Sequence, residues 1–98
     1  CFLIETNLQN ADLSGANLDS AYLNRADFSG ADLTHADFSG ANLSQANLQS
    51  ATLIKADLRD ANLYRADLTN ANLAGARVNR NTKWPDGYDP IAAGVEVD

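Results

Sequence analysis

Hydrophobic residues recur along this chain with a period of five. From Ala11 to Ala76 an alanine stands at every fifth position, and the second residue after each alanine is leucine, phenylalanine or, at the end, Val78. Leu3 and Leu8 extend the series backwards in the same phase. The residue between alanine and leucine is usually Asp or Asn, and the last two residues of each repeat are mostly polar or glycine.

This period fits neither a straight helix nor a straight strand. Five steps along a helix turn a side chain by about 140°, so the leucines would spiral around every face. On a strand, an odd spacing sends successive leucines to opposite sides. The leucines are buried together only if the chain bends once per repeat. The pattern therefore predicts short sides that close into a coil, with coils stacked through backbone hydrogen bonds.

The polar positions agree with a bend in every repeat. Asp and Asn side chains can accept hydrogen bonds from nearby backbone groups and so stabilise sharp turns. Four glycines stand at the last position of their repeats, where a turn favours them: Gly15, Gly30, Gly40 and Gly75.

The pattern Ala-(Asp/Asn)-Leu-x-x, as in Ala31–His35 and Ala61–Arg65, resembles the pentapeptide-repeat family over residues 1–80. The resemblance implies an all-β fold, a right-handed quadrilateral β-helix with four pentapeptides per coil. Sixteen repeats (80 residues divided by five) would then make about four coils. Phe28 and Phe38, two repeats apart, would come from opposite sides of one coil and meet across its axis.

We predict two parts, a pentapeptide-repeat β-helix over residues 1–80 and a C-terminal capping tail over residues 81–98. The tail contains turn-forming Pro and Gly residues, and we expect Trp84 and Tyr88 to cover the last coil. Residues 84–90, Trp-Pro-Asp-Gly-Tyr-Asp-Pro, also resemble the C-terminal tail of many cyanobacterial pentapeptide-repeat proteins.

The N-terminal coil has no such cover in the sequence. The chain opens on Cys1, already inside the repeat, so we expect that residues precede it. Three covers are compatible with the pattern: an upstream segment, a preceding domain, or a second molecule in end-to-end self-association.

Thirteen acidic residues against seven basic ones give a net charge of −6. This charge argues against a partner that is nucleic acid or an anionic membrane, and no apolar run is long enough to span a bilayer. We expect a cytoplasmic protein.

Catalytic chemistry is poorly supported, and we predict that the chain is not an enzyme and has no cofactor. His35, the one histidine, has no nucleophile pattern around it, and Cys1 stands in an inward alanine position. Residues twenty apart would stack, so Asp12 would lie under Asp32 and Asp37 under Asp57. Such pairs can bind calcium, but we interpret them as turn caps rather than a metal site.

The outward positions give one candidate partner face. The side built from the repeats that begin at residues 1, 21, 41 and 61 carries aromatic, aliphatic and arginine side chains, whereas the other sides are mostly polar. Tyr and Arg are enriched where proteins bind one another. The face consists of Phe2, Ile4, Tyr22, Arg25, Tyr64 and Arg65.

We therefore predict a non-catalytic structural or protein-interaction module, a rigid scaffold or the C-terminal part of a longer protein, whose partner the sequence does not name. The alternative is a DNA mimic that binds DNA gyrase or another topoisomerase, as quinolone-resistance members of the family do. Against it, residues 1–80 carry nine acids and six bases, and Arg59, Arg77 and Arg80 interrupt one side.

Overall fold

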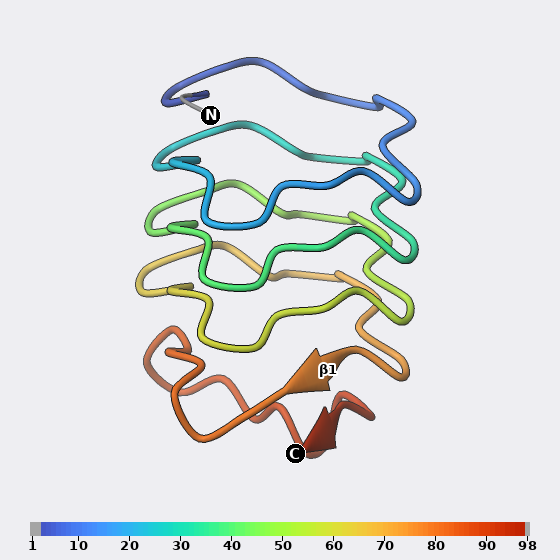
Figure 1. Ribbon diagram of the computed structural model, residues 1–98, viewed down its shortest axis with the longest axis vertical. Helices are drawn as coiled ribbons and strands as arrows, with labels where there is room; N and C mark the ends of the chain where they lie inside the picture. The colour runs from blue at the N-terminus through green and yellow to red at the C-terminus, as the bar shows by residue number, and fades with distance from the viewer. Residues whose placement is uncertain (1–2, 98) are drawn as a thin grey trace.

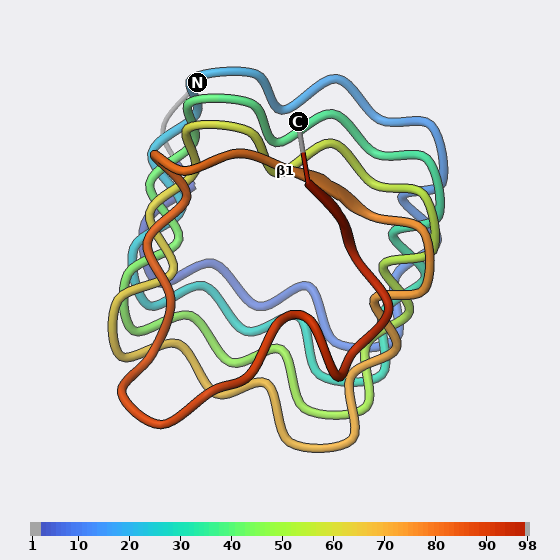
Figure 2. The ribbon, with the colours of Figure 1, turned by 90° about the horizontal axis from the view of Figure 1, so that it is seen from below.

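The computed structural model describes residues 3–97, which wind into a stack of flat-sided coils 29 × 24 × 20 Å in extent (Figure 1). Seen along the stack, the coil has a four-sided outline (Figure 2). The first coil lies at one end of the stack and the tail at the other (Figure 1).

The chain turns a corner once in every pentapeptide. The alanine N–H of one repeat donates to the carbonyl three residues earlier, as from Ala46 to Leu43 at 3.0 Å. The fifth residue of each repeat, just before that alanine, is left-handed, with φ between 57° at Ser20 and 71° at Gly15. The glycines at this position are turn residues, as predicted. Eleven residues other than glycine, from Glu5 to Asn70, adopt the same conformation.

One turn of the coil takes twenty residues. Parallel bridges join each residue before a leucine to its counterpart one turn later, from Asn7 with Asp27 through to Asp57 with Arg77. Twenty residues are four pentapeptides, so the coil has four sides. We number them by their first repeats: side one begins at residue 1, side two at 6, side three at 11 and side four at 16.

Alanine and leucine side chains fill the interior of the stack. The leucines of the middle coils, such as Leu43, are fully buried. The Phe28 and Phe38 rings meet edge to face, with centroids 6.1 Å apart and planes at 84°. Their contact across the axis was predicted from the spacing and is confirmed.

The Asp and Asn residues stabilise the corners, as predicted. The Asp37 carboxylate accepts from the Ser39 backbone N–H at 2.9 Å and from the Ser39 hydroxyl at 2.7 Å. The same bond to the backbone N–H two residues later is made by Asn7, Asp12, Asn17, Asp27, Asp32, Asn42, Asn47, Asp57, Asn62, Asp67, Asn72 and Asn79.

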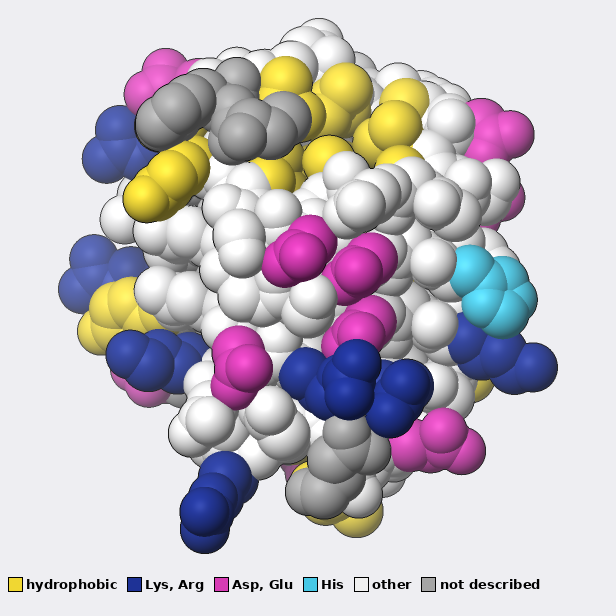
Figure 3. Space-filling view, in the orientation of Figure 1, with side chains coloured by type: hydrophobic (Ala, Val, Ile, Leu, Met, Phe, Trp, Pro, Cys, Tyr) yellow, Lys and Arg dark blue, Asp and Glu magenta, His cyan; other side chains and the backbone are white. Residues whose placement is uncertain are grey.

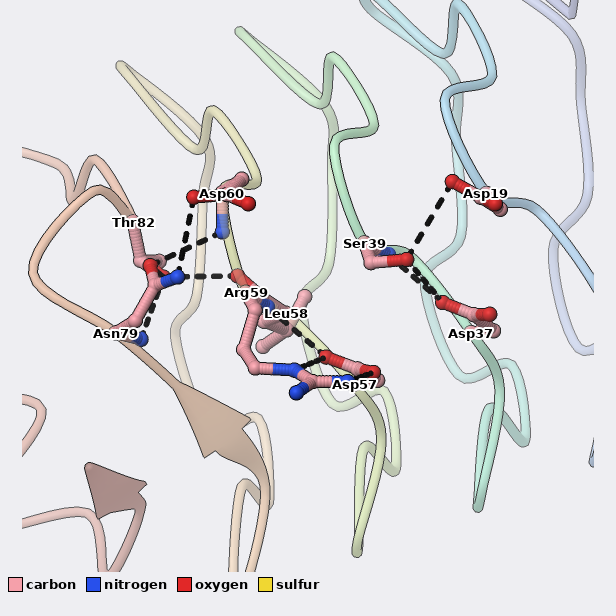
Figure 4. Close-up of polar contacts among 9 residues, drawn as sticks. All are labelled: Asp19, Asp37, Ser39, Asp57, Leu58, Arg59, Asp60, Asn79 and Thr82. Atoms are coloured by element: carbon pink, nitrogen blue, oxygen red, sulfur yellow. Dashed lines mark hydrogen bonds and ion pairs between the residues drawn. The ribbon is translucent and has the colours of Figure 1, made fainter. Parts of the chain in front are cut away.

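Backbone pairing continues past residue 80, where the sequence pattern ends. Asn62 pairs with Lys83, 21 residues later, and Thr82 occupies the buried alanine position before it. The extra residue is accommodated at the corner, where Asn79 and Asn81 donate to the Asp60 carboxylate at 3.0 Å each. The buried Thr82 hydroxyl donates to the Leu58 carbonyl at 2.8 Å (Figure 4).

The two regular strands of residues 3–97 lie at this end. β1, Arg77–Val78, pairs in parallel with β2, Glu96–Val97, so the tail returns beneath side four. At the opposite end, Leu3, Leu8 and Leu13 are only partly buried, and apolar side chains are visible there (Figure 3). Cys1 lies outside the described residues.

The Phe28→Ala substitution tests the packing of the coil axis. We expect it to lower the free energy of unfolding by about 3–5 kcal/mol, because it removes a buried ring and leaves a cavity opposite Phe38. The measurement is chemical denaturation. Leu13→Ala, at the partly buried end, serves as the control and should cost less; equal losses would contradict the packing described.

Candidate interaction surfaces

The predicted partner face lies on side one, and we call its described members the side-one surface: Ile4, Tyr22, Arg25, Tyr64 and Arg65. Phe2 lies outside the described residues. Ile4 and Tyr22 are each 48% exposed and Tyr64 is 45% exposed, which is high for large apolar side chains. The repeat explains their direction, because every position other than those of alanine and leucine points outward.

Part of this surface borders a groove of about 510 Å³. Ile4, Tyr22 and Arg25 line it with four polar residues that the sequence reading did not single out: Asn24, Asn42, Ser44 and Gln45. Their spacing of twenty residues could have identified them as neighbours, since Asn24 lies twenty residues from Ser44 and donates to its hydroxyl at 3.0 Å. The groove therefore combines two apolar side chains with amides, a hydroxyl and a guanidinium.

The arginines of the side-one surface stand at left-handed corners. The Arg25 Nε donates to Gln45 at 3.0 Å, and its guanidinium lies 3.5 Å from the Glu5 carboxylate. Both members of that ion pair are largely exposed, so it contributes little stability. Two coils further on, the Arg65 guanidinium lies 5.3 Å from the Tyr64 ring centroid. Tyr64 and Arg65 thus form a second cluster, apart from the groove.

The aromatic residues of the tail pack together at the other end. The Trp84 and Tyr88 rings are stacked, with centroids 5.4 Å apart and planes at 17°. Both are partly buried against the core. Trp84 follows Thr82 and Lys83 at the spacing of a central leucine. Burial, and then the charge of Asp89, raises the pKa of Tyr88 above its usual value.

Side four carries acidic side chains in three successive coils, at Asp19, Asp37 and Asp57, and basic side chains lie beside and below the last of them (Figure 3). The Arg59 guanidinium pairs with both oxygens of Asp57, at 2.9 Å from Nε and 2.7 Å from Nη2 (Figure 4). This hydrogen-bonded pair, helped by the charge of Arg77, lowers the pKa of the Asp57 carboxyl. The acidic column is thus partly neutralised within the chain.

The stacked carboxylates lie where the sequence placed them, with Asp12 paired to Asp32 and Asp37 to Asp57. Over residues 3–97, no three His, Cys, Asp or Glu side chains are grouped so that they could hold a metal ion. His35 is exposed and borders a hollow of about 260 Å³ with Lys55, Gly75, Arg77 and Glu96. Within the same range, no helix is long and apolar enough to cross a bilayer.

The four flat sides wound from pentapeptides define a β-solenoid, and the surfaces described here are suited to contact rather than to enclosing a substrate. The chain belongs to the pentapeptide-repeat family, whose model (Pentapeptide repeats) matches residues 1–40 and 41–80. Its members fold as right-handed quadrilateral β-helices and are in general non-catalytic structural or interaction proteins.

Two solved structures support this assignment. alr5209, a pentapeptide repeat protein from Nostoc Pcc 7120, is 43% identical with a TM-score of 0.97; the match covers 99% of this chain and 80% of that one. AT2G44920, from the Arabidopsis thaliana thylakoid lumen, is 36% identical with a TM-score of 0.83, covering 85% of this chain and 57% of that one. The likeness to proteins of cyanobacterial type is thus confirmed.

A third structure shares the fold alone. QnrB1, a plasmid-mediated fluoroquinolone resistance protein, is 20% identical with a TM-score of 0.54, covering all of this chain and 61% of that one. Among curated proteins, no match was found.

The pH dependence of stability tests the Asp57–Arg59 pair. In the folded protein the pKa of Asp57 lies below the ordinary value of 3.8. The ionised carboxylate therefore contributes its full stabilisation at pH values above 3.8, and this contribution is lost as the pH falls through the folded-state pKa. We expect Asp57→Asn to lose less stability than the unchanged protein between about pH 6 and about pH 2 in chemical denaturation. The double variant Asp57→Asn/Arg59→Gln should behave like the single one. Parallel pH profiles for all three would contradict the assignment.

Proposed function

We propose that this chain is a rigid, non-catalytic protein-interaction module that docks a partner protein through the side-one surface. The observation that carries the proposal is the gathering of Ile4, Tyr22 and Tyr64, all about half exposed, with two arginines on one flat side. Tyr and Arg are the residues from which binding hot spots are most often built. The groove beside Tyr22 offers a partner side chain a concave anchor point.

The coil supplies the rigidity that such a surface needs. Corner bonds and ladder bonds hold the backbone of the middle coils, so a partner meets side chains whose backbone is already fixed. Less conformational entropy is then lost when the partner binds.

The two ends belong to the same proposal. We regard the chain as about four coils closed by a tail, residues 81–98, in which Trp84 and Tyr88 act as a cap. Their stacking against the core supports this role, because an open end of a solenoid would expose apolar atoms.

At the N-terminal end, the partly buried Leu3, Leu8 and Leu13 support self-association end to end, which stays a prediction. A cytoplasmic location also stays a prediction, since one relative comes from a thylakoid lumen.

Affinity capture from a Nostoc lysate tests the partner surface, since a protein from that source is 43% identical to this chain. We expect the unchanged chain to retain a specific protein that the Tyr22→Ser/Tyr64→Ser variant loses. Thr34→Ser/Ile54→Ser, on side three, is the matched control and should capture the same protein as the unchanged chain.

Equal capture by the side-one and side-three variants, or no specific capture by any of them, would contradict docking through side one. A captured DNA gyrase subunit would instead favour the alternative of a DNA mimic.

A further inference from the structure

The tail leaves one side of the last complete coil without a backbone partner. Side one is paired, since Leu63 donates to the Lys83 carbonyl at 2.8 Å. Side four is paired through β1 and β2. Side three is paired again at Gly75, whose N–H donates to the Gly94 carbonyl at 3.0 Å. The gap therefore covers side two and reaches Leu73 at the start of side three, whose N–H also has no partner within residues 3–97.

We call the backbone of residues 66–70 the side-two edge. One coil earlier, the Leu48 N–H donates at 2.8 Å and the Ser50 N–H at 2.9 Å, while the Ala46 carbonyl accepts at 2.9 Å. The equivalent groups of the side-two edge are the N–H groups of Leu68 and Asn70 and the carbonyl of Ala66. They have no hydrogen-bond partner within residues 3–97.

The gap follows from the way the tail covers the core. Beyond Trp84 the chain turns inward and runs inside the outline of the coil above it (Figure 2). Its own turns, closed by bonds from Tyr88 to Pro85 at 3.1 Å and from Ala93 to Pro90 at 3.0 Å, satisfy its backbone locally. Pro85 and Pro90 have no N–H to add to a ladder. The tail thus covers apolar side chains and leaves the side-two edge open.

A groove of about 440 Å³ separates the side-two edge from the tail. Arg65 to Thr69 line one wall, and Pro85 to Tyr88 line the other. The Asp67 carboxylate on the first wall accepts from Thr69 and from Gln49 in the coil above. The tail wall adds the carboxylate of Asp86. Two carboxylates against the single cation of Arg65 leave the groove net negative.

One carboxylate of this chain has a basic residue beneath it, whereas Asp12 and Asp37 have other carboxylates at that ladder position. On side four, Arg77 is the ladder partner of Asp57, one coil further on, and its charge helps to lower the pKa of the Asp57 carboxyl. A basic residue therefore suits the vacant ladder position beneath Asp67.

We propose that the groove along the side-two edge binds an extended segment of a partner protein, which pairs in parallel beneath residues 66–70 as a further strand of side two, with Lys or Arg opposite Asp67. Strand addition supplies affinity through the backbone, and the charge opposite Asp67 supplies selectivity. A second copy of this chain does not fit, because the tail already covers the core and pairs with sides one and four. Next to the basic residue, the segment needs small inward side chains, since Tyr88 borders the space they would enter.

This site goes beyond the proposed function. It uses backbone groups of side two and the tail wall, whereas the side-one surface uses Tyr22 and Tyr64. The two sites approach each other only at Arg65, so one segment could continue around that corner.

The probe is a blocked peptide that copies residues 75–79, Gly-Ala-Arg-Val-Asn, the segment that lies beneath Asp57 in this fold. We expect saturable shifts of the Leu68 and Asn70 amide signals in the NMR spectrum of the full chain, at peptide concentrations up to about 1 mM. Hydrogen exchange at these two amides should slow upon binding, while exchange at Leu48 and Ser50 should not change.

Charge reversal at Asp67 distinguishes binding at this site from non-specific binding of the peptide. Asp67→Lys should weaken peptide binding by about tenfold or more. Asp27→Lys is the matched control: Asp27, two coils earlier on side two, accepts from Gln9 and Ser29 as Asp67 does from Gln49 and Thr69, but its backbone is paired both above and below. The control variant, and also Tyr22→Ser/Tyr64→Ser, should bind as tightly as the unchanged chain.

The proposal is overturned if the Leu68 and Asn70 signals do not respond to the peptide. It is equally overturned if Asp67→Lys binds as well as Asp27→Lys, or if a peptide with Glu in place of Arg binds as well as the original. The variant amide spectra show directly whether each protein is folded.

Discussion

One left-handed residue in every five is the constraint on which the structure depends. It turns the chain at the end of each pentapeptide. The alanine and leucine positions of successive repeats therefore all point inward, although equivalent positions lie an odd number of residues apart. Outside glycine, this conformation costs about 1–2 kcal/mol per residue. The corner hydrogen bond, the buried central side chain and, in most repeats, the Asp or Asn side-chain bond offset that cost.

The same constraint explains how much the sequence could predict. Burial of the leucines, the meeting of Phe28 with Phe38 and the role of Asp and Asn at corners all follow from local spacing. Four sides and a right hand do not, because a bend every five residues fits more than one closed coil; they came from the family resemblance. Left-handed corners at residues such as Lys55 were also hidden, since nothing in their chemistry favours that conformation.

The surfaces were less predictable than the fold. Periodicity located the outward residues of side one, but not the amides that complete the groove beside Tyr22, because they count only through neighbours twenty residues away. Pairing beyond residue 80 was missed because Thr82 replaces alanine and one extra residue shifts the register. The open edge on side two had no sequence signal at all, since it depends on where the tail does not pair.

A scaffold of this kind separates stability from recognition. Its interior and corners are fixed by the repeat, so outward side chains can vary without loss of the coil. Because each coil pairs its backbone with the next, the last coil of the stack is left with an unpaired edge. In this protein the tail covers the core but only part of that edge, which gives the chain both a side-chain surface and a backbone surface for partners.

The most direct test of the left-handed corner is a substitution series at Ser50, an exposed residue with φ of 58°. Chemical denaturation should show Ser50→Gly at least as stable as the unchanged protein, because glycine adopts this conformation without strain. Ser50→Val should be less stable by about 1–2 kcal/mol, because a branched side chain suits it worst. The account would be contradicted if Ser50→Val were as stable as the unchanged protein and Ser50→Gly were about 1 kcal/mol less stable, as expected for glycine in ordinary extended structure.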